Sequence, residues 1–367
     1  MSDEIIAPAP AGKYMVDAYD NWARAEGVPV HEALAFDLNT VETRPWARLG
    51  INGAICYLTG RDDYLTIHLL DLAPGAQTEP QRHIFEAVFY VVSGRGSTTV
   101  ETSDGASHTF EWGPRSLFAV PMNAGYRLFN ASGRDGARIA MVSDMRYLLQ
   151  LFRSESFLFS NPARFPDREG RPDHYAGKGE FLAVRPGRHM WETNFVPDVA
   201  SFELKEWAER GAGASSLRFL LADSILGVHA SELPVGTYKK AHRHLPGYCI
   251  FAVTGTGYTL NWFEGDEELT RIDWKPGVVY APGLQVFHQH FNTGPTPARY
   301  IAIQYGSVRY PMVRDKVFIY DKGADTSVKD GGGQIEYADQ HPTIHALFLE
   351  ELRKTGVAPR MDAFVKT

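Results

Sequence analysis

The feature that most constrains the fold of this chain is an internal repeat, in which matching residues lie 161 positions apart. The matches are Trp46 and Trp207, Gly50 and Gly211, His68 and His229, Gly75 and Gly236, Arg82-His83 and Arg243-His244, Gly94 and Gly255, and Ala137-Arg138 and Ala298-Arg299. A constant offset over this length indicates duplication of one structural unit. The 367 residues provide enough chain for two domains, each with its own core. The repeat therefore predicts two similar domains in tandem.

Short β-rich runs, separated by Pro, Gly, Asp or Asn, make up most of both copies. They cover 64–70, 87–92, 116–120 and 138–142 in the first copy, and 224–229, 249–253, 278–281 and 300–303 in the second. Residues of high β propensity in runs of this length indicate strands. Many short strands at near-regular spacing are typical of a β-sandwich or a small barrel.

Helices are expected only at the edges of the two copies. The segment 342–355 begins with a proline, is followed by Gly356 and places Ile344, Leu347, Phe348 and Leu352 on one stripe. A weaker helix is predicted from Tyr14 to Glu26. The predicted organisation is an N-terminal helical or extended segment (1–44), the first domain (45–150), a connection (151–199), the second domain (200–310) and a C-terminal loop and helix (311–367).

The composition is that of a soluble globular protein and excludes two classes of partner. Hydrophobic residues make up 44% of the chain, charged residues 22%, and the net charge is −7. This acidic balance provides no basic face for nucleic acid or anionic lipid, and no apolar run has the length of a transmembrane helix. The first residues lack the pattern of a secretion signal, and Cys56 and Cys249 lie in strand-like runs. We expect a cytoplasmic protein with reduced thiols and a small-molecule substrate.

A cluster of histidines occurs only in the second copy. His242 and His244 alternate along a predicted strand, so both imidazoles face the same side. His288 lies on a later strand and, in a barrel, can complete a site of three nitrogen ligands. Imidazole binds borderline divalent ions such as Fe(II), Mn(II), Ni(II), Zn(II) and Cu(II). The alternative is a set of unconnected histidines, but the flanking glycines and the third histidine favour a metal site.

The first copy lacks this set of ligands. It has Gln81 and His83 at the paired positions. Tyr126 replaces the later histidine if a one-residue gap is allowed, and Arg127 replaces it without the gap. Neither Tyr nor Arg is a suitable ligand for such a site. We expect the first copy to be a structural or dimerisation module.

The second copy resembles the two conserved motifs of the cupin superfamily. The pattern is Gly236-x5-His242-x-His244 followed by Gly255, and then Pro282 to His288-x3-Asn292. Because of the internal repeat, the chain resembles a bicupin over residues 45–150 and 200–310. The resemblance implies an all-β fold of two tandem cupin barrels (double-stranded β-helix, or jelly-roll) with peripheral helices. These motifs specify a fold much more than a reaction.

The chain departs from most metal-binding cupins at one position. The glutamate that usually follows the second histidine of the motif by four residues is Tyr248 in the second copy and Ala87 in the first. Glu86 is one residue away, so on a strand its side chain is expected to face the other side. The all-histidine set that results resembles the three-histidine cupins, among them the bicupin gentisate 1,2-dioxygenases.

This resemblance implies a non-haem Fe(II)-dependent dioxygenase that uses O2 to cleave a small anionic substrate, hydroxylated and aromatic. Two alternatives remain. One is a metal-dependent isomerase, lyase or hydrolase that needs no O2, and the other is a non-catalytic bicupin that binds a small molecule. Bicupins commonly associate, so a homodimer or a higher homo-oligomer is expected.

Further side chains are expected beside the metal. His290 shares the face of His288, so we predict that it handles protons or forms hydrogen bonds in the pocket; a fourth ligand is the alternative. Substrate contacts are predicted for Arg218, Tyr238, Tyr248, Trp262 and Gln304. Arg218 in particular interrupts an apolar strand, and a buried arginine requires an anion. Residues that match in both copies, His68 with His229 and Asn130 with Asn292, are expected to be structural.

Overall fold

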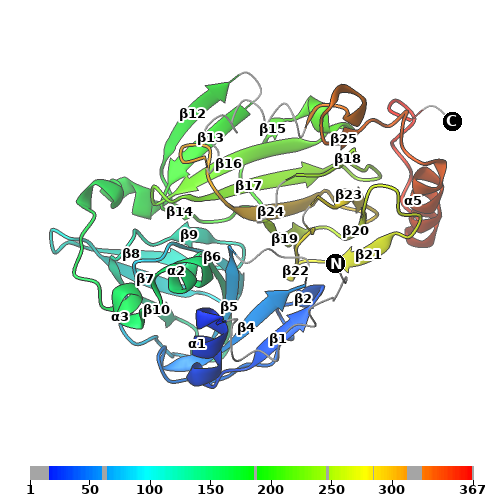
Figure 1. Ribbon diagram of the computed structural model, residues 1–367. Helices are drawn as coiled ribbons and strands as arrows, with labels where there is room; N and C mark the ends of the chain where they lie inside the picture. Colours follow the sequence, from blue (N-terminus) through cyan, green and yellow to red (C-terminus); the bar gives the residue numbers. More distant parts are fainter. Residues whose placement is uncertain are drawn as a thin grey trace, which may run out of the picture.

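The computed structural model describes residues 16–59, 64–185, 188–244, 248–283, 285–311 and 325–365. Each copy of the repeat folds into a β-barrel made of a larger and a smaller sheet, and the two barrels pack against each other (Figure 1). The sheets have 8 and 3 strands in the first barrel and 9 and 5 in the second. The predicted all-β fold is confirmed, because the chain forms two tandem β-barrels with peripheral helices.

The first barrel uses strands of the first copy and short strands from its flanks. Its larger sheet contains β1 (Val30–Ala33), β3 (Arg44–Trp46), β4 (Ile51–Leu58), β5 (Thr66–Leu72), β6 (Ala87–Ser93), β9 (Leu117–Ala119), β11 (Ala137–Ser143) and β14 (Phe195–Val196). Its smaller sheet contains β7 (Gly96–Glu101), β8 (Ser107–Trp112) and β10 (Gly125–Asn130).

The second barrel repeats this plan with additional strands. Its larger sheet contains β2 (Ala35–Asp37), β12 (Glu180–Arg185), β13 (Arg188–Thr193), β15 (Lys205–Glu206), β16 (Ser215–Leu221), β17 (Leu226–Leu233), β19 (Tyr248–Thr254), β22 (Val278–Tyr280) and β24 (Ala298–Tyr305). Its smaller sheet contains β18 (Ala241–His242), β20 (Gly257–Trp262), β21 (Thr270–Trp274), β23 (Phe287–Asn292) and β25 (Gln334–Ile335).

The helices lie at the periphery, as predicted. They are α1 (Ala18–Glu26), α2 (Met145–Phe152), α3 (Glu155–Phe159) and α5 (Pro342–Thr355), with short 3-10 turns η1 (Pro166–Arg168), η2 (Pro172–Ala176), η3 (Ala208–Arg210) and η4 (Val328–Asp330). Helix α5 has the predicted bounds and ends at Gly356 in a left-handed conformation. Among the described residues, no helix is long and apolar enough to cross a lipid bilayer.

The strand registers of the two barrels agree with the repeat. In the smaller sheets, Gly96 lies opposite Asn130 in the first barrel, and Gly257 lies opposite Asn292 in the second. Both glycines are required by close packing, because a Cβ atom at Gly96 or Gly257 would lie 2.0 or 1.9 Å from a backbone carbonyl oxygen. The duplicated unit therefore keeps its local geometry as well as its sequence.

The two barrels share strands across the predicted domain boundaries. Strand β2, from the N-terminal segment, pairs with β22 of the second barrel. Strand β14, from the connection, pairs with β9 of the first barrel, while the β12–β13 hairpin extends the larger sheet of the second. A common apolar core between the larger sheets contains both Cys56 and Cys249, which are buried and not joined to each other by a disulfide. The barrels thus form one packed unit.

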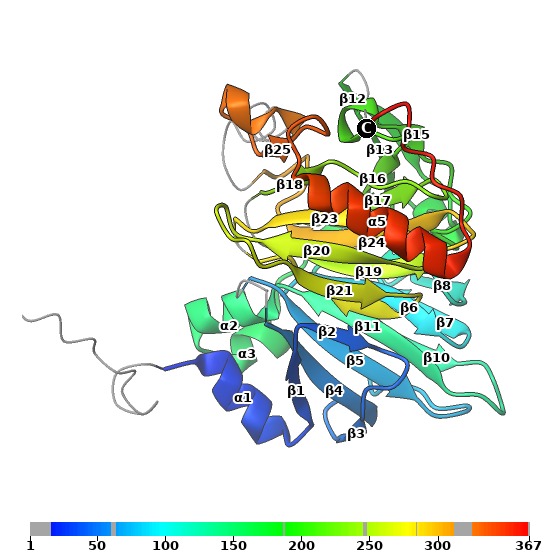
Figure 2. The same ribbon diagram turned by 90° about the vertical axis from the view of Figure 1, so that its right-hand side faces the viewer.

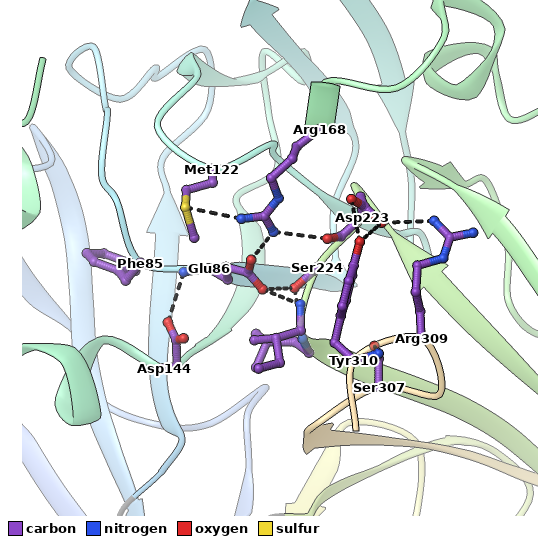
Figure 3. Close-up of polar contacts among 12 residues, drawn as sticks. Phe85, Glu86, Met122, Asp144, Arg168, Asp223, Ser224, Ser307, Arg309 and Tyr310 are labelled. Carbon is purple, nitrogen blue, oxygen red and sulfur yellow. Dashed lines mark hydrogen bonds and ion pairs between the residues drawn. The ribbon is translucent and has the colours of Figure 1, made fainter. Parts of the chain in front are cut away.

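A buried glutamate also joins the two barrels (Figure 3). The Glu86 carboxylate forms an ion pair with Arg168 of the connection and accepts hydrogen bonds from the Ser224 hydroxyl and, at 2.5 Å, from the backbone N–H of Ile225. Glu86 therefore points away from the interior of the first barrel, as its position in the strand predicted. The carboxyl of Asp144 accepts from the Glu86 backbone N–H at 2.9 Å. Burial, together with the charge of Glu86, raises the pKa of Asp144 to about 8.

Two helices cover the barrels in different ways. Helix α1 packs Tyr19 and Trp22 into the core of the first barrel, where the Tyr19 hydroxyl lies 2.6 Å from Nε2 of His68. Helix α5 lies over the smaller sheet of the second barrel (Figure 2) and buries Ile344 and Phe348 against it. Helix α1 thus contributes to the core of the first barrel, whereas α5 packs on the smaller sheet of the second.

Candidate metal centre

Three histidines of the second barrel converge inside it. His242 ends β18 and lies directly opposite His288 of β23, while His244 follows two residues later. The ligand nitrogens that the three side chains offer all lie within 4.8 Å of one another. Their ring centroids are 4.2, 4.7 and 5.5 Å apart. The structure therefore brings the three predicted ligands together.

The environment keeps the imidazoles of His242 and His288 neutral and orients them. Nδ1 of His242 lies 3.3 Å from the carbonyl oxygen of Lys240, and Nδ1 of His288 lies 3.2 Å from that of Val286. Because a carbonyl oxygen only accepts, Nδ1 carries the proton and the Nε2 lone pair is left for a metal. Burial, followed by the charge of Arg210, lowers the pKa of His242 well below its usual range, and burial lowers that of His288 to about 3.

This donor set fits a divalent transition metal. Three imidazole ligands at this spacing, two of them buried, suit Fe(II), Mn(II), Ni(II), Zn(II) and Cu(II). Among the described residues, no carboxylate belongs to the group. Tyr248 lies beside this group, with its ring centroid 4.1 Å from that of His244. The described site is therefore an all-nitrogen one.

The three histidines form part of the wall of an interior cavity of about 40 Å³. The other described lining residues are mostly polar or charged. They are Arg210, Ser216, Arg218, His229, Tyr248, His290, Tyr300 and Asp325, together with Trp207, Ile250 and Ala302. Such a wall, with two guanidinium groups beside a cation site, suits a small anionic ligand.

Arg210 is a cavity residue that the sequence reasoning missed. It is 4% exposed, lies in η3, and has its guanidinium 3.4 Å from the carboxylate of Asp325. Its counterpart in the first copy is Leu49, which belongs to the apolar core of the first barrel. The sequence does contain a signal for this residue: the repeat places an arginine where the first copy has a leucine, each directly before a matching glycine.

His290 lies beside the three histidines but is held by other partners. It is 1% exposed and lines the cavity. Its Nδ1 lies 2.9 Å from the hydroxyl of Thr259 and 3.1 Å from that of Tyr280. It does not belong to the group of converging ligand atoms. This arrangement supports the predicted hydrogen-bonding role over ligation.

Of the residues predicted to contact substrate, Arg218 and Tyr248 line the cavity. Tyr238 does not, which corrects that prediction. Its ring packs under α5, 4.9 Å from the ring of Phe348, and its hydroxyl lies 3.1 Å from Nδ1 of His345. It belongs to the core between the smaller sheet and α5.

Trp262 and Gln304 also lie outside the described wall of the cavity, contrary to their predicted role. Trp262 ends β20 on the face opposite to that of Asn261, packs against the α5 core and borders an outer groove. The amide of Gln304 donates to the carbonyl oxygen of Gly306 at 2.7 Å and lines a separate cavity of about 10 Å³ that Arg218 also borders. Neither position was distinguishable from a cavity position by strand alternation alone.

The first barrel shows why its copy of the site has no metal ligands to offer. Gln81 pairs with Tyr126 in an isolated bridge, and His242 pairs with His288 at the matching position of the second barrel. Tyr126 is therefore the counterpart of the third ligand, His288. The Tyr126 hydroxyl lies 3.1 Å from Nε2 of His83, the nitrogen that a metal would use. The amide of Gln81 instead donates to the carbonyl oxygens of Arg48 and Glu79.

The residues that match in both copies have mixed roles. Asn130 and Asn292 each donate to three backbone carbonyl oxygens and accept one backbone N–H, which confirms their predicted role in the turn. His68 is buried against Tyr19 and is structural. His229 lines the metal cavity, so the structural role expected for it from the match alone is corrected.

No family model and no curated protein matches the sequence. Among solved structures, a mutant of Bacillus subtilis oxalate decarboxylase is similar with 14% identity and a TM-score of 0.49 over 78% of this chain and 83% of that one. The Lactobacillus farciminis oxalate decarboxylase formate complex has 12% identity and a TM-score of 0.48 over 76% and 87%. Tomato vicilin has 10% identity and a TM-score of 0.48 over 75% and 85%. At such values, function must be argued from the site itself.

Proposed function

We propose that this protein is a metal-dependent enzyme that converts a small anionic substrate in its second barrel by Lewis-acid chemistry, as an isomerase, lyase or hydrolase that needs no O2. One observation carries the proposal: His242, His244 and His288 meet on the wall of an interior cavity that Arg210 and Arg218 also line. A bound divalent ion would supply positive charge that polarises a substrate oxygen.

The residues of the chain supply binding and orientation. The two arginines provide planar donors that match a carboxylate. Most of the cavity wall is made of buried side chains, and low polarity around them strengthens electrostatic contacts. His290 is fixed through Nδ1 by Thr259 and Tyr280, so its ring is positioned for proton transfer or hydrogen bonding in the cavity.

The size of the cavity favours a substrate smaller than a benzene ring. An engineered cavity that accommodates benzene in another protein measures about 150 Å³, whereas this cavity measures about 40 Å³. A hydroxylated aromatic acid would therefore require the wall to move. For this reason we place Lewis-acid chemistry on a short anion ahead of ring cleavage.

A second candidate is a non-haem Fe(II) dioxygenase that acts on a small anion. The absence of a carboxylate from the described ligand group favours it, because three neutral ligands leave the ion its full charge for a chelating anion together with O2. A hydroxylated aromatic substrate remains the expectation attached to this candidate.

The test combines metal analysis with turnover under nitrogen. Freshly purified protein should contain one divalent ion per chain, and a panel of short mono- and dicarboxylic acids should be assayed with and without O2. Product formed under nitrogen, and retained after replacement by Zn(II), supports the Lewis-acid enzyme, because Zn(II) has no redox chemistry. Turnover that requires both O2 and Fe(II) would move the assignment to the dioxygenase. Tight ligand binding without product under either atmosphere would indicate a binding protein.

A further inference from the structure

A fully buried lysine stands behind one wall of the metal cavity. Lys239 is 1% exposed, and its Nζ donates to the Ser231 hydroxyl and, at 3.0 Å, to the hydroxyl oxygen of Tyr300. Tyr300 is 7% exposed and lines the cavity with the three histidines. Burying an ammonium group costs free energy unless it is hydrogen-bonded, so its position behind this tyrosine indicates a specific role.

The direction of these hydrogen bonds defines what Tyr300 can do. A lysine ammonium has three donors and no acceptor, so the Tyr300 oxygen accepts from Lys239. A phenol that accepts from Lys239 keeps its own proton for a second partner, which is either the Ser231 side chain, also hydrogen-bonded to Tyr300, or a ligand oxygen in the cavity. The neighbouring cation makes the hydroxyl a stronger donor. Burial raises the pKa of Tyr300 to about 12, which keeps the phenol protonated at neutral pH.

The first barrel provides an internal control for this arrangement. Ser231 lies opposite Tyr300 in the second barrel, and Leu70 lies opposite Ile139 at the matching positions of the first. Thr78 matches Lys239, since its backbone N–H donates to Leu128 just as that of Lys239 donates to His290. Leu70 and Ile139 belong to the apolar core of the first barrel, and Thr78 is a buried polar residue without a charge. The group of lysine, serine and tyrosine thus occurs only in the barrel with the metal ligands.

We propose that Tyr300 donates a hydrogen bond to an oxygen of a short-chain carboxylate bound beside the three histidines, and that Lys239 is the residue that positions the Tyr300 hydroxyl. This inference rests on the proposed function and adds the recognition of the substrate to it. Arg218 lies on the same wall as a further positive charge, together with Arg210, which is paired with Asp325. Tyr300 provides the directed contact. The cavity of about 40 Å³ limits the ligand to a short chain.

The experiment uses protein loaded with Co(II) and acetate as the probe. Co(II) gives a visible absorption that reports changes around the ion, so an acetate titration yields a dissociation constant without any turnover. Wild-type protein should respond to acetate and not to the uncharged acetamide. Tyr300→Phe should keep its Co(II) and weaken acetate binding about tenfold or more, the loss expected for one hydrogen bond to a charged group. Tyr337→Phe is the matched control, because this buried tyrosine loses one hydrogen bond to the Tyr238 carbonyl oxygen outside the cavity; its acetate affinity should stay unchanged.

The role of Lys239 is tested by coupling. Lys239→Met should weaken acetate binding in the same direction, and Lys239→Met combined with Tyr300→Phe should be no weaker than Tyr300→Phe alone, because the lysine acts through the tyrosine. Additive losses would overturn the positioning role. Equal acetate affinities of wild type and Tyr300→Phe, or no response of wild type to acetate, would overturn the inference while leaving the metal site intact. Failure to bind Co(II) would remove the proposed function as well.

Discussion

At the scale of single residues, the duplication shows what separates a metal site from a packed core. His83 and His244 occupy matching positions, but the Tyr126 hydroxyl caps Nε2 of His83, whereas His244 meets two further imidazoles. The same backbone fold therefore holds a packed core in one barrel and a group of metal ligands in the other, and a few side chains make the difference.

This contrast predicts different effects of the two matching substitutions on metal content. His244→Ala removes one of three converging ligands, so the ion should be lost or bound at least tenfold more weakly. His83→Ala should leave metal content unchanged, because no second and third ligand lie beside the His83 ring. Elemental analysis of both purified variants gives the answer. A stoichiometry near two per wild-type chain, falling to one in His83→Ala, would show that the first barrel binds metal too.

A second residue-scale prediction concerns His290. Its ring is held by Thr259 and Tyr280 and lies outside the ligand group, so His290→Ala should retain the ion while turnover falls about a hundredfold, as is common for loss of a proton-transfer group. Metal analysis and steady-state kinetics on the same preparation separate the two properties. Loss of the ion in this variant would instead make His290 a fourth ligand.

At the scale of elements, helix α5 is held by packing on its own barrel. Phe348 is fully buried, with its ring 4.9 Å from that of Tyr238. Phe348→Ala should lower the free energy of unfolding by about 3–5 kcal/mol, the usual loss for a buried aromatic side chain. Leu347→Ala, one residue away and 38% exposed, should change it by less than about 0.5 kcal/mol. Chemical denaturation of both variants measures the difference, and equal effects would show that α5 is not docked as described.

The elements also show how far the sequence alone could lead. Helix α5 was predictable to the residue, because Pro342, Gly356 and the apolar stripe between them are local signals. The metal ligands were predictable because strand alternation and the repeat act together. No local sequence pattern indicates which strand a three-residue strand such as β2 will pair with. Nor does a local pattern indicate which side chains the curvature of the barrel brings to the cavity. Tyr300 and Lys239 were missed, and Trp262 was misplaced, for this reason.

At the scale of the whole molecule, the expected homodimer needs a surface other than α5. Ile344, Phe348 and Leu352 of the apolar stripe of α5 are buried against its own barrel. Of the stripe, only Leu347 is exposed to a partner. We still predict a dimer at micromolar concentration, since related architectures commonly associate. Sedimentation velocity tests this, and a single monomeric species would refute it.

The two barrels are also joined by a buried acidic cluster that makes the stability of the whole molecule depend on pH (Figure 3). Burial and the charge of Glu86 raise the pKa of Asp144 to about 8 from its ordinary value of 3.8, with Arg168 as the opposing charge. Between these values the folded protein holds a proton that the unfolded chain has released. The stabilisation from this proton is complete below the ordinary pKa and is lost as the pH rises through about 8.

Asp144→Asn should therefore flatten the pH dependence of unfolding. An asparagine carbonyl can still accept the Glu86 backbone N–H, but it carries no proton to lose. The gain in unfolding free energy over wild type should increase between pH 5 and pH 8 by up to about 1.4 kcal/mol per pH unit, the limit for one proton. Denaturation curves across this range measure the gain, with the exposed Asp330→Asn as a control that should not alter the slope. A wild-type slope retained in Asp144→Asn would assign the pH dependence to another group and leave Glu86, Arg168 and Ser224 as a contact between the barrels that is insensitive to pH.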